Sequence, residues 1–236
     1  MPPPGDPPPW MAFFPVRGSG GLAALMAERY DRYVGAVRDD LASPLFGDLD
    51  RIVVLVDLLS ALSRGPASFS DAAAALALAA GALRWQRSWT EVLLALGRLQ
   101  MPPRSIGRVA FAATKADHVA AGQRGNLAAL TRAIALGGNE VAVSHLPVAA
   151  VRCTEDATWL LDGRAVSAVE GRMAGKGRVR SYPGEVPALP PGPAFWAHPF
   201  FALPEFEPPL LAEGGRGGVP QLDLDALLAF LLEDVL

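Results

Sequence analysis

The sequence predicts an α/β fold: a partial three-layer parallel sheet with flanking helices, then a β-hairpin, a Pro/aromatic extension and a C-terminal helix. Two mainly apolar stretches, residues 51–57 and 108–113, have the composition of strands that are buried on both faces. Stretches of helical spacing alternate with these runs, and such alternation implies right-handed crossovers and a parallel sheet. After Cys153 the pattern changes to turn and loop signals, so we expect the parallel sheet to end there.

The 236 residues divide into three segments. Residues 1–18 hold six prolines among their first nine positions, which precludes a helix, and we expect a disordered proline-rich tail. A proline-rich ligand for an SH3-like partner is the alternative. Residues 19–153 contain the parallel sheet. Residues 154–236 contain the hairpin, the Pro/aromatic loop and the C-terminal helix, packed on that sheet.

Composition restricts the class of protein. With 21 basic and 24 acidic side chains and a formal charge of −3, the chain lacks the basic surplus of a general nucleic-acid binder. Cys153 is the only cysteine, so no internal disulfide forms and a reducing compartment is expected. No apolar run approaches the roughly 20 residues of a membrane span, and no signal-peptide pattern is present. We therefore expect a cytoplasmic protein without a transmembrane segment.

The chain up to residue 153 contains three helical patterns. Apolar residues recur at steps of three and four over residues 20–41. A second helix is expected after a Gly65-Pro66 loop, with Ser70 and Asp71 as its cap, and helical pattern continues in two pieces to about residue 99. The last runs from about Gln123 to Leu136, and a third buried strand is expected within residues 142–153.

The segment 154–236 begins with a hairpin whose two-residue turn is Asp162-Gly163. This stretch is locally basic and could contact phosphates, although a solvated hairpin face is the alternative; its basic residues are Arg164, Arg172, Lys176, Arg178 and Arg180. Residues 183–209 combine prolines with aromatic side chains, which favours a loop packed on the core. An amphipathic helix follows, with an expected buried side of Leu224, Leu227, Leu228, Leu231, Leu232 and Val235.

The most informative residues are Thr114, Lys115 and Asp117, which follow the apolar run 109–113. Ligands of open α/β sheets bind outside the carboxyl ends of the strands. A carboxylate there can accept hydrogen bonds from guanine N1–H and the exocyclic amino group, the lysine stem can cover the purine, and the threonine hydroxyl can tie the loop to backbone. The pattern resembles the guanine-reading motif of Ras-like GTPases. The alternative is an ordinary strand-to-helix loop in which Asp117 favours the next helix.

Other chemistry-bearing motifs are missing from these 236 residues. His118, His145 and His198 are isolated, and neither a G-x-S-x-G segment nor a dinucleotide fingerprint is present. There is no G-x-x-x-x-G-K-[ST] phosphate loop; the nearest match, residues 171–177, is one residue short and follows a hairpin pattern. We therefore predict no catalytic residue and no metal ligand.

Several blocks, taken in order, resemble the YcjX-like P-loop NTPase family: residues 50–57, 65–71, 111–118, 181–187, 195–196 and 222–232. The resemblance extends from about Phe13 to the last residue and corresponds to the C-terminal half of such a protein. It implies part of a Ras-like fold in a bacterial, cytosolic, stress-associated GTP-binding protein.

The resemblance also implies a site. Thr114, Lys115 and Asp117 match the guanine-recognition motif, and the backbone N–H groups of the loop Ala149-Ala150-Val151 would face guanine O6. The implied cofactor is GTP or GDP, bound weakly or only together with a missing N-terminal half, and Mg²⁺ is implied only with that half. The phosphate-binding and water-positioning residues have no counterpart here, so the family's GTPase activity cannot be assigned to this chain.

Two other functions stay open. Residues 52–56 are apolar on both faces, which suits an interior strand, yet the neighbouring phosphate-loop strand is absent and an apolar edge would be exposed. The chain could therefore be a non-catalytic interaction module, or a degenerate fragment, that binds a partner through this edge or through the C-terminal helix. It could also belong to another nucleotide-dependent enzyme in which Asp117 is only a helix cap.

Overall fold

The computed structural model describes residues 20–36, 49–83, 106–135, 142–197, 202–211 and 217–235. The chain forms two units, Met1–Asp50 with Arg87–Ser105 and Arg51–Gln86 with Ile106–Leu236. In the first unit, helix α1 spans Gly21–Ala36, inside the stretch where helical spacing was found. The proline-rich tail and the helical pattern between residues 84 and 99 lie outside the described residues. No helix in the described ranges has the length and apolarity needed to cross a membrane.

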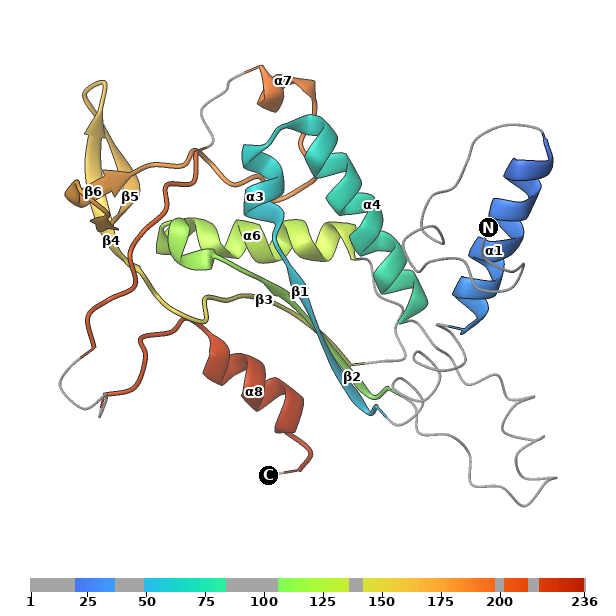
Figure 1. The fold of residues 1–236 in the computed structure, drawn as a ribbon. Coiled ribbons are helices and arrows are strands. Elements are labelled where there is room, and N and C mark those ends of the chain that lie inside the picture. Colours follow the sequence, from blue (N-terminus) through green and yellow to red (C-terminus); the bar gives the residue numbers. More distant parts are fainter. Residues whose placement is uncertain are drawn as a thin grey trace. The chain divides into compact units, whose positions relative to one another are not determined.

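The second unit contains the predicted parallel sheet. Strands β1 (Arg51–Val56), β2 (Arg108–Ala113) and β3 (Ala142–Pro147) lie in the order β1-β2-β3, and both neighbouring pairs are parallel (Figure 1). β2 is central and buried at all positions except Arg108. Its alanines at 110, 112 and 113 leave room for helices to approach both faces. The α/β prediction and the positions of all three strands are confirmed.

Helices cover both faces of this sheet (Figure 1). Helices α3 (Leu58–Ser63), α4 (Pro66–Ala82) and α6 (Ala121–Ile134) lie on one side, and α8 (Leu224–Leu232) lies on the other. The first face has the larger core, and it includes Leu62, Phe111 and Leu127. Ala110, Ala112 and Leu227 form the core of the second face. The layers therefore follow from the alternation of side chains along β2.

The predicted break at Gly65 is present, but the expected helix cap at Ser70 and Asp71 is wrong, and a helix between β1 and this break was not predicted. The chain enters α3 at once, and the Asp57 carboxylate caps this helix by accepting a hydrogen bond from Ser60 N at 3.0 Å. Helix α4 then begins at Pro66, preceded by Gly65 with φ of 101°. Proline suits the first helical position because the N–H group that it lacks would have no partner there. Ser70 and Asp71 consequently lie inside α4 rather than at its start.

The hairpin prediction is confirmed, but the sheet is larger than predicted. β4 (Thr154–Leu161), β5 (Arg164–Met173) and β6 (Gly177–Ser181) form an antiparallel sheet in that order. Asp162 and Gly163 have φ of 49° and 75°, and two positive values are typical of a type I′ hairpin turn. The third strand, β6, was not predicted.

The described part of the Pro/aromatic loop packs on the core, as expected. Phe195 and Trp196 of the short helix α7 (Pro193–Trp196) and Leu203 contact the main core.

The buried side of α8 is narrower than the sequence predicted. Leu227 is buried and Leu224 and Leu231 are half-buried, whereas three expected core residues are exposed: Leu228 at 55%, Leu232 at 37% and Val235 at 63%. A helix that packs on one sheet face buries only one stripe of its side chains, and here that stripe follows the spacing i, i+3, i+7.

Candidate functional site

The carboxyl ends of β1 and β2 are tied together by Thr114. Its backbone N–H donates to the Val56 carbonyl at 2.8 Å, and its hydroxyl donates to the same oxygen at 3.3 Å. This is the backbone tie that the sequence predicted for the threonine. Lys115 then adopts a left-handed conformation with φ of 62°, which is uncommon outside glycine and turns the chain into the short helix η3 (Ala116–His118).

The Lys115 ammonium lies beside the carboxyl end of β1. It forms an ion pair with Asp57 Oδ2 at 2.8 Å and donates to Ser60 Oγ at 2.6 Å. Burial alone would raise the pKa of Asp57, but hydrogen bonds from Lys115 and Ser60 outweigh burial and hold that pKa below its ordinary value. Nearly half of the Lys115 side chain stays exposed, at 46%. Asp57 and Ser60 thus orient the Lys115 ammonium, while much of the side chain remains exposed to solvent.

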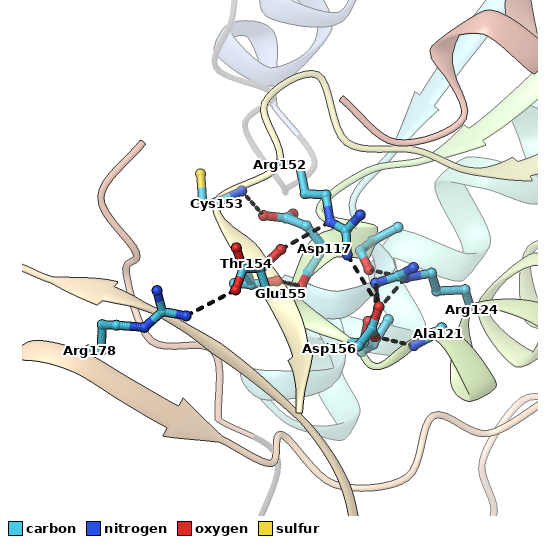
Figure 2. A network of polar contacts seen from close by, with 11 residues as sticks. Asp117, Ala121, Arg124, Arg152, Cys153, Thr154, Glu155, Asp156 and Arg178 are labelled. Atoms are coloured by element: carbon cyan, nitrogen blue, oxygen red, sulfur yellow. Dashed lines mark hydrogen bonds and ion pairs between the residues drawn. The ribbon is translucent and has the colours of Figure 1, made fainter. Parts of the chain in front are cut away.

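Asp117 is almost completely buried, at 3% exposure. Its Oδ2 accepts a hydrogen bond from Cys153 N at 3.0 Å, and its carbonyl oxygen accepts one from the Thr154 hydroxyl (Figure 2). The carboxylate therefore faces the chain that follows β3. Sequence reasoning missed both partners, because no local pattern links positions so far apart.

The alternative role of Asp117, as a cap of the following helix, belongs to another residue. The first N–H of α6, that of Ala121, donates to Asp156 Oδ1 at 2.7 Å. Ala120, at the N-cap position, has no side chain able to accept a hydrogen bond. Because Asp156 comes from β4, the helix is capped from the antiparallel sheet, and the Asp117 carboxylate is not needed for this purpose.

The loop Ala149-Ala150-Val151 lies next to this turn. The Ala116 N–H donates to the carbonyl of Val148 at 3.1 Å, which places the start of the loop beside η3. Ala149 exchanges two backbone hydrogen bonds with Leu222, at 3.0 and 2.9 Å, so its N–H is already engaged. The N–H groups of Ala150 and Val151 donate to no other group in the described part of the chain, and both residues are exposed.

His118 is the last residue of η3. Its ring packs on that of Phe206 with 5.4 Å between centroids, and its Nδ1 is buried with no hydrogen-bond partner among the described residues. Burial lowers the pKa of His118, against the opposing effect of the Asp117 charge. The neutral ring is therefore favoured, and it serves as an apolar contact.

Three basic residues of the antiparallel sheet, Arg172, Arg178 and Arg180, have acidic partners. Glu170 pairs with Arg178 at 2.6 Å and with Arg180 at 2.8 Å, and Arg172 pairs with Glu207 at 3.6 Å. These contacts support a solvated, ion-paired face rather than a phosphate site. Within the described ranges, no three His, Cys, Asp or Glu side chains gather as a metal site.

Comparison with known proteins identifies relatives of this chain. The Ras-like GTPase YcjX of Escherichia coli (strain K12) is 32% identical over 221 residues, which cover 91% of this chain and 46% of that protein. The Ras-like GTPase YcjX of Shewanella oneidensis is 31% identical over 221 residues, covering 90% of this chain and 44% of that protein. The chain thus spans less than half the length of the curated relatives that it matches. The profile of the YcjX-like family (DUF463) matches residues 1–236, and the chain belongs to that family.

Proposed function

We propose that this chain carries the base-reading part of a guanine-nucleotide site at the carboxyl end of β2. The observation that supports it best is the Asp117 carboxylate, which is buried and held beside the loop after β3 by the Cys153 N–H. Both curated relatives are described as Ras-like GTPases, and the Thr-Lys-x-Asp pattern fits that description. These observations support recognition of the guanine base and do not bear on GTP hydrolysis.

In this proposal each residue has a separate task. Asp117 accepts hydrogen bonds from guanine N1–H and the 2-amino group, and the Lys115 stem lies along the purine face. The open N–H groups of Ala150 and Val151 face O6, while Ala149 anchors their loop to Leu222. A base that lacks these two donors would leave the buried Asp117 carboxylate without hydrogen-bond partners. The free-energy cost of this unpaired carboxylate would make the site bind such a base more weakly than guanine.

Phosphate and Mg²⁺ contacts would come from outside this sequence, since its 236 residues contain no G-x-x-x-x-G-K-[ST] segment. Backbone N–H groups at a helix N-terminus supply much of the affinity of such sites for phosphate. We therefore expect this chain alone to bind guanine nucleotides weakly and not to hydrolyse GTP.

Titration of a fluorescent GDP analogue tests this proposal. We expect weak binding that guanosine reverses and adenosine does not, and we expect Asp117→Ala to abolish it. Asp71→Ala, on the exposed side of α4, is the matched control and should bind like the parent. Equal competition by adenosine would contradict base reading, and sub-micromolar affinity would contradict the assignment of phosphate binding to another part.

A second candidate function is partner binding through β1. Leu55 of β1 is 70% exposed, and β1 is an edge strand with no outer neighbour among the described strands. Exposed apolar edges are templates for pairing with another chain. Recovery of a stable partner that Leu55→Lys releases, together with undetectable guanosine binding, would favour this function over the first.

A further inference from the structure

We infer that Asp156 is a positioning residue for the proposed guanine site, through which strand β4 fixes the turn that carries Asp117. The consequence for base reading rests on the proposed function, whereas the contacts belong to the structure itself. Among the described residues, the polar partners of the Asp156 carboxylate are Ala121, Arg124 and Arg152, and Asp117 is not one of them. Its effect passes through three neighbours, which Figure 2 shows around its carboxylate.

The first route passes through the backbone of α6. Asp156 Oδ1 accepts the hydrogen bond from Ala121 N at 2.7 Å, which satisfies a donor that the helix itself cannot. α6 begins four residues after Asp117 in the sequence, so the cap fixes where the turn must end. The cap comes from β4, and it therefore ties the start of α6 to the antiparallel sheet.

The second route passes through Arg124. Its Nη2 lies 3.2 Å from Asp156 Oδ1, and its Nε donates to the carbonyls of Ala116 at 3.3 Å and Val119 at 3.2 Å. These two carbonyls flank Asp117 in the chain. Only 14% of the Arg124 side chain is exposed, so the ion pair holds a mostly enclosed cation against the turn.

The third route passes through Arg152 and the segment that contacts Asp117 directly. Arg152 donates from Nη2 to Asp156 Oδ2 at 3.2 Å and from Nε to the Thr154 carbonyl at 3.0 Å. Cys153 and Thr154 lie between Arg152 and Asp156 in the chain. The Cys153 N–H donates to the Asp117 carboxylate, and the Thr154 hydroxyl donates to the Asp117 carbonyl. Asp156 thus stabilises the backbone shape of residues 152–156 that presents both groups.

If Asp156 served only to stabilise the fold, its substitution would lower the stability of the chain without changing its preference between bases. The Asp156 side chain is 39% exposed, and partly exposed ion pairs contribute little to stability on average. The contacts instead converge on the orientation of one carboxylate. The discriminating quantity is therefore the preference for guanosine over inosine, which lacks only the 2-amino group that Asp117 would read.

The test compares Asp156→Ala, Asp156→Asn and the parent chain by ligand-observed NMR titration with guanosine and with inosine. We expect Asp156→Ala to lower the guanosine-to-inosine affinity ratio by about fivefold or more, as when a hydrogen bond is misplaced. Asp156→Asn keeps an acceptor for Ala121 N and should retain part of the ratio. Glu155→Gln is the control, because Glu155 neighbours Asp156 on β4 and pairs with Arg178 instead; its ratio should be unchanged.

Amide hydrogen exchange gives a second readout that needs no ligand. We expect faster exchange at the Cys153 N–H in Asp156→Ala, because this group reports its bond to Asp117, and no change in Glu155→Gln. An unaltered ratio together with unaltered Cys153 exchange in both Asp156 variants would overturn the inference, even if the melting temperature fell. A parent that does not prefer guanosine would contradict the proposed function instead, and Cys153 exchange would still decide whether Asp156 positions Asp117.

Discussion

The two sheets of this chain are stabilised in different ways. β2 of the parallel sheet is buried along nearly all of its length, between two apolar cores. β4 of the antiparallel sheet is mostly exposed, and the ion pairs of its sheet lie on the surface. Apolar burial contributes more to stability than exposed ion pairs do. The parallel sheet should therefore carry the stability of the fold.

The antiparallel sheet and the residue before it nevertheless supply hydrogen bonds to Asp117 of the candidate site. Thr154 and Asp156 of β4 bond the Asp117 carbonyl and the first turn of α6, and Cys153 just before β4 bonds the Asp117 carboxylate. The comparison teaches that the sheet which adds least to the core can still determine where a functional side chain points. Substitutions in the two sheets should therefore have separable effects.

The largest expected effect is in the core of the parallel sheet. Leu130 of α6 is fully buried, and Leu130→Ala should lower the free energy of unfolding by about 2–5 kcal/mol, because it removes buried apolar contacts and leaves a cavity. Leu160 of β4 is 70% exposed, and Leu160→Ala should change it by less than about 0.5 kcal/mol. Urea denaturation measures the free energy of unfolding of both variants. Equal losses in the two variants would contradict the conclusion that the parallel sheet carries the stability of the fold.

The next effect is at the junction of β5 and residues 202–211. A Cβ on Gly171 would lie 2.6 Å from Phe206 Cδ1 and 3.0 Å from the Cys153 carbonyl, so Gly171→Ala should destabilise by about 1–3 kcal/mol. Gly125→Ala, inside α6 with open space around the new Cβ, should instead stabilise by about 0.5–1 kcal/mol. Thermal unfolding with the same sign for both variants would show that the close approach at Gly171 is unimportant.

A smaller effect is expected on the pH dependence of stability. Burial holds the pKa of His118 below the ordinary 6.5, so below that pH the unfolded chain binds a proton that the folded chain does not. Stability should then fall as pH decreases from about 6.5 towards the folded pKa. His118→Phe keeps a ring against Phe206 without titrating, and it should flatten the curve of unfolding free energy against pH. Some pH dependence should remain in this variant, because burial also lowers the pKa of His145. If His118→Phe leaves the curve unchanged, His118 does not contribute to the pH dependence of stability.

The smallest effect is expected on the ion-paired face. Arg178→Ala removes exposed pairs with Glu155 and Glu170 and should leave the urea midpoint almost unchanged at physiological salt. Guanosine preference should not change either, because Arg178 contacts neither Asp117 nor Asp156. A large loss of stability would mean that the antiparallel sheet contributes more than its burial indicates.

Local sequence was sufficient for some elements and insufficient for others. The bounds of β2 and the Asp162-Gly163 turn were predictable, since burial on both faces and the turn type each restrict the residues allowed. The helix Leu58–Ser63 was missed because six residues show too little of a helical period, although Asp57 before it is a suitable cap. β6 was not predicted because Arg178 and Arg180 on either side of Val179 indicate a basic, solvated face as readily as a strand.

The site was predictable only in part, for a different reason. Thr114, Lys115 and Asp117 are close in sequence, so one motif identifies them. The bond between Asp156 and Ala121 depends on how two separate sheets pack, and residues 35 positions apart carry no local signal for it. Asp57 could have been found, since it directly follows a parallel strand, at the same edge of the sheet as Thr114.

The most direct test of the account exchanges the hydrogen-bonding character of Asp117. Asp117→Asn replaces an acceptor by a group that can donate to the C2 carbonyl of xanthine. Guanosine and xanthosine binding to the parent and the variant should be compared by ligand-observed NMR, with Asp71→Asn as control. The account predicts that the parent and the control prefer guanosine and that Asp117→Asn prefers xanthosine. An unchanged preference for guanosine in a folded Asp117→Asn variant would contradict it.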